Sequence, residues 1–188
     1  NLMIGMKMLF ENFIETGSEY SPSKFDIGPV FSTLSSNFND GLRFRFGGQT
    51  TANLHPHLFL KGYYAHAFKS KENYYDVQLI YSFSSPKYQP YEYPKRTLTI
   101  ESMRDVALPS DKFLDSDKDN VFTSIKTTDI DKMFLYNRQS VRLDYEWLNG
   151  FKVYGEMRTE KVRPLGIIAF KPMGRITQLS SIRYSEGT

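Results

Sequence analysis

The acidic segment that begins at Asp115 carries residue types that could bind a cation. Asp115, Asp117 and Asp119 stand at alternate positions, and carboxylate oxygens are among the ligands that calcium takes in proteins. An EF-hand loop needs glycine at its sixth position and glutamate at its twelfth, where this chain has Asn120 and Lys126. The pattern therefore predicts a solvated acidic loop, with a weak calcium site formed by the three aspartates as the alternative.

The histidines are the other candidate metal ligands. His55 and His57 flank Pro56 at a turn, and His66 lies further along the strand that follows this turn. Zinc sites usually take three or four ligands from histidine, cysteine and acidic side chains. The chain has no cysteine, and no acidic residue stands close to these histidines in the sequence. We predict that they are turn and strand residues, and that the chain binds no metal and no other cofactor.

Motifs of common enzymes are missing from the sequence. Gly47-Gly48 is not followed by the Gly-Lys-Ser/Thr of a phosphate loop, and no Gly-x-Ser-x-Gly elbow occurs. In a strand, this glycine pair predicts a bulge or a bend. Glu156 and Glu160 share a strand face with Arg158 between them, so an ion-paired surface explains them better than a pair of catalytic carboxylates. We therefore expect no enzyme activity and no catalytic residues.

Charge and length narrow the class of protein. The 188 residues include 24 Lys and Arg and 21 Asp and Glu, for a net charge of +3. Basic residues alternate with acidic ones instead of forming the basic patch of a nucleic-acid-binding protein, so we expect no nucleic-acid partner. The length suits one domain. No stretch approaches the roughly 18–20 apolar residues of a membrane-spanning helix, so any membrane crossing must use strands.

Alternation of apolar and polar residues, the signature of a half-exposed β-strand, dominates the chain. It is clearest in four segments, at residues 41–47, 75–83, 141–147 and 151–158. Asn149-Gly150 joins the last two and predicts a hairpin, because both residues tolerate a positive φ. Weaker strands are predicted at residues 25–31, 58–68, 96–104, 165–170 and 176–184. Pro29 indicates an edge or a bend in the first of these, and residues 2–14 suit either a short amphipathic helix or a strand.

The two faces of these strands favour a barrel in a membrane. The polar faces of the last hairpin carry opposite charges, as the interior of such a barrel does: Arg142, Asp144, Glu146, Lys152, Glu156 and Arg158. Aromatic residues gather near strand ends, where barrels have aromatic girdles: Tyr63, Tyr64, Phe68, Tyr74, Tyr75, Tyr81, Phe83, Tyr145, Trp147 and Phe151. Tight turns at 53–57 and 149–150 and long loops at 84–95 and 106–119 predict short connections at one edge and long ones at the other. The alternative is a soluble β-sandwich or lipocalin-like barrel with an aromatic core.

Several segments resemble one family of membrane proteins. These segments are KFDIGPVFS at residues 24–32, GLRFRFGGQTTANL at 41–54, FLKGY at 59–63 and DNVF at 119–122, together with the hairpin at Asn149-Gly150. They are similar to the large Bacteroidota outer-membrane β-barrel family of unknown function, whose members often carry an N-terminal carboxypeptidase-regulatory-like domain. The resemblance covers most of the chain. It implies a bacterial outer-membrane location, a barrel with more strands than these residues supply, and a soluble β-sandwich preceding them. It brings no catalytic residues.

Together these observations predict an all-β fold in which residues 1–188 form part of one antiparallel transmembrane β-barrel. We expect a non-enzymatic, structural, accessory or transport-related subunit of an outer-membrane assembly. Its expected partners are outer-membrane lipid and lipopolysaccharide, and other outer-membrane or surface proteins that dock on its loops. A stand-alone channel or export pore is one alternative. A soluble β-sandwich or barrel that binds an apolar ligand or a surface partner is the other.

Overall fold

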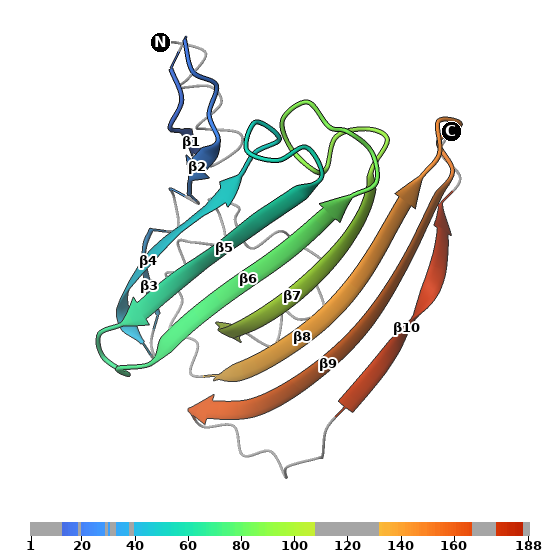
Figure 1. Ribbon diagram of the computed structural model, residues 1–188. Coiled ribbons are helices and arrows are strands. Elements are labelled where there is room, and N and C mark those ends of the chain that lie inside the picture. Colours follow the sequence, from blue (N-terminus) through green and yellow to red (C-terminus); the bar gives the residue numbers. More distant parts are fainter. Residues whose placement is uncertain are drawn as a thin grey trace.

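The protein is all-β in the part of the chain that its computed structural model describes, which comprises residues 13–18, 20–28, 30, 33–37, 40–107 and 132–166 and the backbone of 176–185. Its strands are β1 (Ile14–Glu15), β2 (Phe25–Ile27), β3 (Leu34–Asn37), β4 (Gly41–Thr50), β5 (Leu58–Ala67), β6 (Asn73–Ser82), β7 (Arg96–Ala107), β8 (Lys132–Glu146), β9 (Lys152–Gly166) and β10 (Ile176–Ser185). They form one antiparallel sheet (Figure 1). The described residues include no helix long and apolar enough to cross a membrane.

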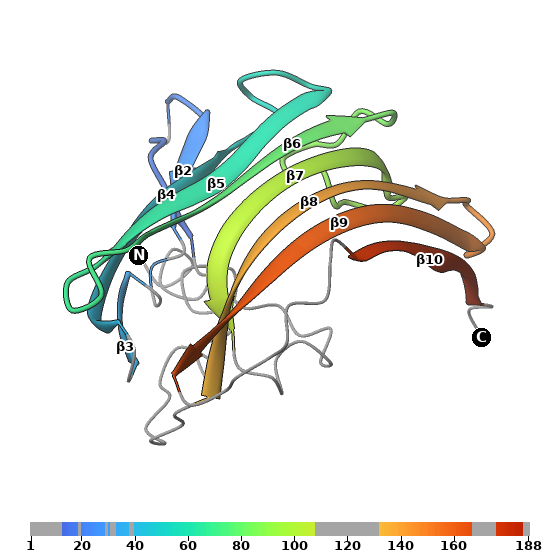
Figure 2. The ribbon, with the colours of Figure 1, turned by 90° about the horizontal axis from the view of Figure 1, so that it is seen from below.

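The sheet is open and strongly curved. Its strands follow one another in the order β1-β2-β4-β5-β6-β7-β8-β9-β10, with β3 also paired to β4, so β1 and β10 stand at opposite ends. Figure 2 shows that β4 to β10 curve around one concave side. The predicted antiparallel all-β fold is therefore confirmed, while the described strands do not close into a barrel.

The predicted strand at residues 25–31 is shorter than expected. It ends at Ile27, and β3 then resumes the pairing further along β4: Phe25 opposes Thr50, whereas Leu34 opposes Phe44. Two backbone hydrogen bonds, from Gly28 N to Gly47 O and from Arg45 N to Thr33 O, bridge the interruption. Proline has no backbone N–H to give to a ladder, which explains a break next to Pro29.

The hairpin predicted at Asn149-Gly150 is confirmed, with a different turn. Backbone hydrogen bonds from Trp147 N to Phe151 O and from Gly150 N to Trp147 O close a loop of three residues. Gly150 has a φ of +84°, and Asn149 is not among the described residues with a positive φ. Its side chain instead accepts a hydrogen bond from Phe151 N, at 3.2 Å. Such a loop places one left-handed glycine at its end, so only Gly150 needs the conformational freedom.

Long and short connections lie at the same edge of the sheet. The prediction that short connections lie at one edge and long ones at the other is therefore wrong. The tight turns after β4 and β8 lie at the edge that also holds the long loop 83–95 after β6 (Figure 1). The tight turn 68–72 lies at the opposite edge. In an antiparallel sheet every second connection falls on the same side, whatever its length. Loop length in the sequence therefore does not assign a connection to an edge.

Most other predicted strands are found near their predicted positions. The predicted strand at 165–170 is not a separate element as far as it is described, because β9 continues without interruption to Gly166. The rest of that segment, the aspartates at 115, 117 and 119, the loop from residue 108 on, and residues 2–12 lie outside the described residues.

Candidate functional site: the two faces of the sheet

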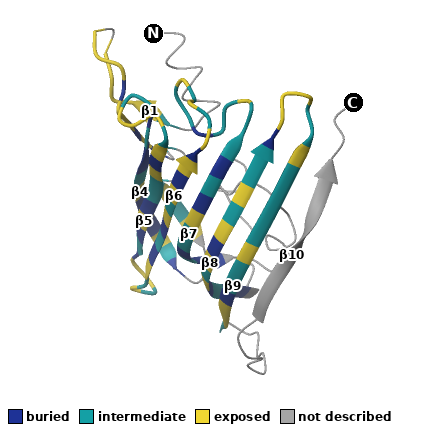
Figure 3. Ribbon diagram, turned by 45° about the vertical axis from the view of Figure 1, so that its right-hand side comes forward, coloured by how far each residue is buried: buried dark blue, intermediate teal, exposed yellow. Residues whose placement is uncertain are grey.

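The convex face of the sheet is apolar and exposed. A row of register partners crosses five neighbouring strands at its centre: Leu60, Leu79, Ile100, Val141 and Met157. Each of these side chains is between 42% and 62% exposed. Along a single strand, exposed apolar and buried residues alternate (Figure 3). A one-sided sheet in water buries its apolar face, whereas this sheet exposes apolar side chains across its whole convex face.

The exposed apolar residues of the convex face, which we call the apolar band, run obliquely to the strands. One row of partners begins at aromatic residues and ends at polar ones: Phe46, Tyr64, Tyr75, Arg104, Asn137 and Lys161. The apolar residues of β4 centre on Phe44, two residues from Phe46, and those of β9 centre on Gly155, six residues from Lys161, which is a combined shift of eight residues. Over the five strand spacings from β4 to β9, this shift corresponds to strands tilted by about 45–50° to the normal of the band. Strands of transmembrane barrels are tilted by about 35–45°.

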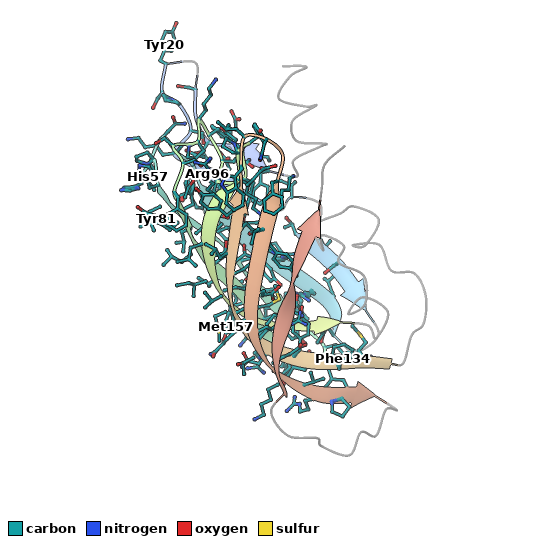
Figure 4. The ribbon with its side chains drawn as sticks, turned by 90° about the vertical axis from the view of Figure 1, so that its right-hand side faces the viewer. Tyr20, His57, Tyr81, Arg96, Phe134 and Met157 are labelled. Carbon is teal, nitrogen blue, oxygen red and sulfur yellow. The ribbon has the colours of Figure 1, made fainter. Side chains whose placement is uncertain are left out.

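Aromatic rings line the convex face where it meets the edge with loop 83–95. Trp147 lies against Tyr145 and Phe151, with ring centroids 4.6 and 5.4 Å apart. Tyr81 stacks on His57, with ring centroids 6.2 Å apart. Figure 4 shows His57 and Tyr81 near this edge and Met157 further down on the same side. Of the aromatic residues predicted to form a girdle, Tyr81, Tyr145, Trp147 and Phe151 lie here, at the margin of the apolar band. The prediction is wrong for Tyr63 and Tyr74, which are buried on the opposite, concave face.

The concave face is buried and mixes charged side chains with apolar and aromatic ones such as Tyr63, Ala65 and Tyr74. Its fully or nearly buried charged side chains come from six strands: Asp26, Arg43, Arg45, Asp76, Asp105, Glu146 and Glu160. Buried charges are stable only when paired or hydrogen-bonded, because desolvation costs several kcal/mol for each ion. The contacts on this face therefore decide how the sheet holds its shape.

Asp105 is the centre of one contact cluster. Its carboxylate accepts a hydrogen bond from Arg43 Nη1 at 2.7 Å and another from the Tyr63 hydroxyl at 2.6 Å. The Arg45 guanidinium lies 3.5 Å above the Tyr63 ring. We call Arg43, Tyr63 and Asp105 the Asp105 cluster. It joins β4, β5 and β7 across the concave face.

A second cluster links β6, β7 and β8. Gln78 Nε2 donates hydrogen bonds to Asp76 and to Glu101, both at 3.0 Å. The Ser140 hydroxyl donates to the other oxygen of Glu101 at 2.9 Å. The Gln78 amide thus bridges the carboxylates of Asp76 and Glu101, and these two hydrogen bonds involve no cation.

Loop 83–95 is ordered by its own side chains and by distant strands. The Tyr88 hydroxyl donates to both oxygens of Asp26 on β2, at 2.8 and 3.0 Å, and the Tyr93 hydroxyl donates to Leu148 O at 2.7 Å. Burial and the hydrogen bond to Asp26 raise the pKa of Tyr88 well above its usual range. The loop therefore connects β2 with the β8–β9 turn.

Glu92 fixes the interior of this loop. Its carboxylate accepts hydrogen bonds from the backbone N–H groups of Lys87, Tyr88 and Gln89, at 2.7 to 2.9 Å. Burial by itself would raise the pKa of this carboxyl, but the backbone hydrogen bonds lower it by more. Glu92 therefore stabilises the loop in its charged form.

The rings of His55 and His57 lie 6.5 Å apart, but His66 does not join them. His55 Nδ1 accepts hydrogen bonds from the backbone N–H groups of His57 and Leu58, at 3.2 and 2.9 Å, which makes it a turn residue. His57 Nδ1 lies 3.0 Å from Ser82 O. His66 stands near the other end of β5 and contacts Asn73. Among the described residues, no group of three His, Cys, Asp or Glu side chains is placed to hold a metal ion.

The glycine pair and the paired glutamates have structural roles. The register of β4 on β5 passes through Gly47 and Gly48 without a shift, so the predicted bulge does not occur in that pairing. A Cβ on Gly47 would stand 2.5 Å from the carbonyl oxygen of Gly62, so close packing of neighbouring backbones requires glycine there. Glu160 lies 3.8 Å from Arg138 on the neighbouring strand, in agreement with the ion-paired face that was predicted.

Sequence reasoning missed the Asp105 cluster and the Tyr88–Asp26 contact. Both contacts join residues that are far apart in the chain. Arg43 and Asp105 are separated by 62 positions, as are Tyr88 and Asp26, and Tyr63 and Asp105 by 42. The only signal in the sequence is a charged residue at a polar position of an alternating strand. That signal marks a face but does not choose a partner.

Comparison of the chain with protein-family models, with curated proteins and with solved structures finds no match. The contacts of the described concave face include ion pairs and hydrogen bonds between strands, together with packed apolar side chains such as Tyr63, Ala65 and Tyr74. Such an arrangement can hold a curved wall with a charged interior.

Proposed function

We propose that this chain forms part of the wall of a bacterial outer-membrane β-barrel and has no chemistry of its own. The observation that carries the proposal is the polarity of the sheet, which exposes an apolar convex face and buries an ion-paired concave face. Hydrocarbon is the solvent that such a convex face fits, and a charged interior is typical of these barrels.

The oblique course of the apolar band supports the same proposal independently. In a soluble sheet, contact with water does not favour a band of exposed apolar residues that is tilted relative to the strands. A bilayer is a flat slab, and tilted strands cut it obliquely. The band also ends at aromatic residues such as Trp147 and Tyr145, which suit the depth of lipid headgroups.

The open edges fit a wall that belongs to a larger barrel. An unpaired strand edge in hydrocarbon leaves backbone groups without hydrogen bonds, at a cost of several kcal/mol each. Further strands at the β1 and β10 ends would satisfy them. The resemblance to the Bacteroidota outer-membrane family agrees with this reading. In the proposed role the barrel is a structural, accessory or transport-related subunit, surrounded by outer-membrane lipid and lipopolysaccharide and docking other outer-membrane or surface proteins through its loops.

Fluorescent labelling at single cysteines tests the proposal. The 188 residues contain no cysteine, so Leu79→Cys and Gln78→Cys each introduce one reporter into this chain, on opposite faces of β6. The complete protein would be isolated from membranes and placed in vesicles that contain a lipid-chain quencher. We expect strong quenching at Leu79 and weak quenching at Gln78. Equal quenching, or a protein that stays soluble without detergent, would instead favour the soluble β-sandwich or barrel.

Conductance in a planar bilayer separates the accessory role from the stand-alone pore. A reproducible open channel formed by the purified protein would count against a purely accessory role. A sealed bilayer with correctly folded protein would support it. Folding is checked on the same sample by the shift in gel mobility on heating that closed barrels show.

A further inference from the structure

We infer that the Asp105 cluster is a crosslink that sets the curvature of the sheet between β4 and β7. Its members are Arg43, Tyr63 and Asp105, from three different strands. The inference concerns the shape of the sheet and applies whether or not the sheet lies in a membrane.

The span of the ion pair requires curvature. β5 and β6 lie between β4 and β7 in the sheet. In a flat sheet these outer strands are about 14 Å apart. Arg43 Nη1 nevertheless lies 2.7 Å from the Asp105 carboxylate, and both side chains are less than a tenth exposed. The contact thus runs across the concave side of the arc seen in Figure 2.

Small side chains leave room for this crosslink. Ala67 and Ala65 stand directly opposite Arg43 and Arg45 on β5, and both alanines are fully buried. Larger residues at these two positions would fill the space through which the arginines pass. The floor of the concave face is therefore built from residues that let the two arginines reach over β5.

A second contact on the same side reinforces the curve. The Arg43 guanidinium also lies 4.6 Å from the centre of the Tyr74 ring on β6, and the Tyr74 hydroxyl donates to Asp40 at 2.6 Å. Arg43 thus touches β6 and β7 while it is anchored on β4. The ion pair of Arg138 with Glu160, elsewhere on the concave face, joins strands that are direct neighbours and imposes no such constraint.

Distance measurements between spin labels test the inference. Phe46→Cys on β4 and Ser102→Cys on β7 would carry the labels on the convex face. Labels there splay apart when the sheet curves, so a flatter sheet brings them closer together. In the Asp105→Ala variant we expect the distance to shorten by an amount on the order of one strand spacing, about 5 Å, and its distribution to broaden.

Two controls isolate the effect. Glu160→Ala removes a carboxylate that pairs with a neighbouring strand, and we expect no change in the distance from β4 to β7. Labels at Ile100 and Met157, on β7 and β9 and therefore outside the span from β4 to β7, should keep their distance in Asp105→Ala.

An unchanged distance in folded Asp105→Ala would overturn the inference. So would an equal change in Glu160→Ala. If Asp105→Ala does not fold, the test uses Tyr63→Phe, which removes one hydrogen bond within the cluster. This variant should broaden the distribution of distances between the β4 and β7 labels. An unchanged distribution in Tyr63→Phe would then overturn the inference. The label distances are measured in whichever fraction, membrane or soluble, holds the protein. A failure of the membrane proposal is recognised separately, because the protein would then be soluble without detergent.

Discussion

Leu79→Arg places a charge at the centre of the exposed apolar row. Leu79 is 42% exposed and has apolar register partners on both sides, Leu60 and Ile100. If this row faces hydrocarbon, an arginine at mid-depth costs about 2–4 kcal/mol. That corresponds to a loss of about 30-fold to 900-fold in the ratio of folded to unfolded protein. If the row faces water, a substitution at a half-exposed position costs about 1 kcal/mol or less.

Gln78→Arg is the matched control on the opposite face of the same strand. Gln78 donates to the carboxylates of Asp76 and Glu101, and an arginine keeps N–H donors for both. We therefore expect this change to be mild. The assay is urea unfolding of the complete protein in phosphatidylcholine vesicles, with the folded fraction read from the heat-modifiable gel band. An equal loss of stability in the two variants would refute the assignment of the convex face to lipid.

Further predictions address the band, the glycines and the loop. Val77 and Thr159 lie in one row of register partners, but only Val77 lies in the apolar band, so Val77→Arg should cost about 2–4 kcal/mol and Thr159→Arg much less in the same assay. Gly47→Ala should cost about 1–3 kcal/mol in urea unfolding, because its Cβ would meet backbone carbonyls at 2.5 and 2.9 Å, whereas Gly155→Ala meets nothing within 4 Å and should be neutral or slightly stabilising. The folded-state pKa of Glu92 is lowered from 4.5, so its contribution to loop stability is present above about pH 4.5 and is lost as the pH falls through the lowered value. A spin label in the same loop should therefore gain mobility between pH 5 and pH 2 in the native protein, and Glu92→Gln should remove that dependence on pH; a native loop whose label is insensitive to pH would contradict the role of the carboxylate.

The strands and their two faces could be predicted from the sequence because the period of a strand is local. Leu42, Phe44 and Phe46 against Arg43 and Arg45 give the two faces of β4 from five consecutive residues. Where the pattern fails, the prediction fails with it. Met133, Phe134, Leu135 and Tyr136 are consecutive apolar residues, so the first half of β8 was not recognised as a strand.

The contacts across the concave face were decided only by the tertiary structure. Asp105 could have paired with any basic residue on a polar strand face, and the folded sheet pairs it with Arg43, 62 positions away. The partner of Tyr88 was equally open until loop 83–95 was placed beside Asp26. The sequence by itself determined which residues share a face, since alternation depends on neighbours in the chain. Which charges meet on that face depends on strand order and curvature, and these are properties of the whole sheet.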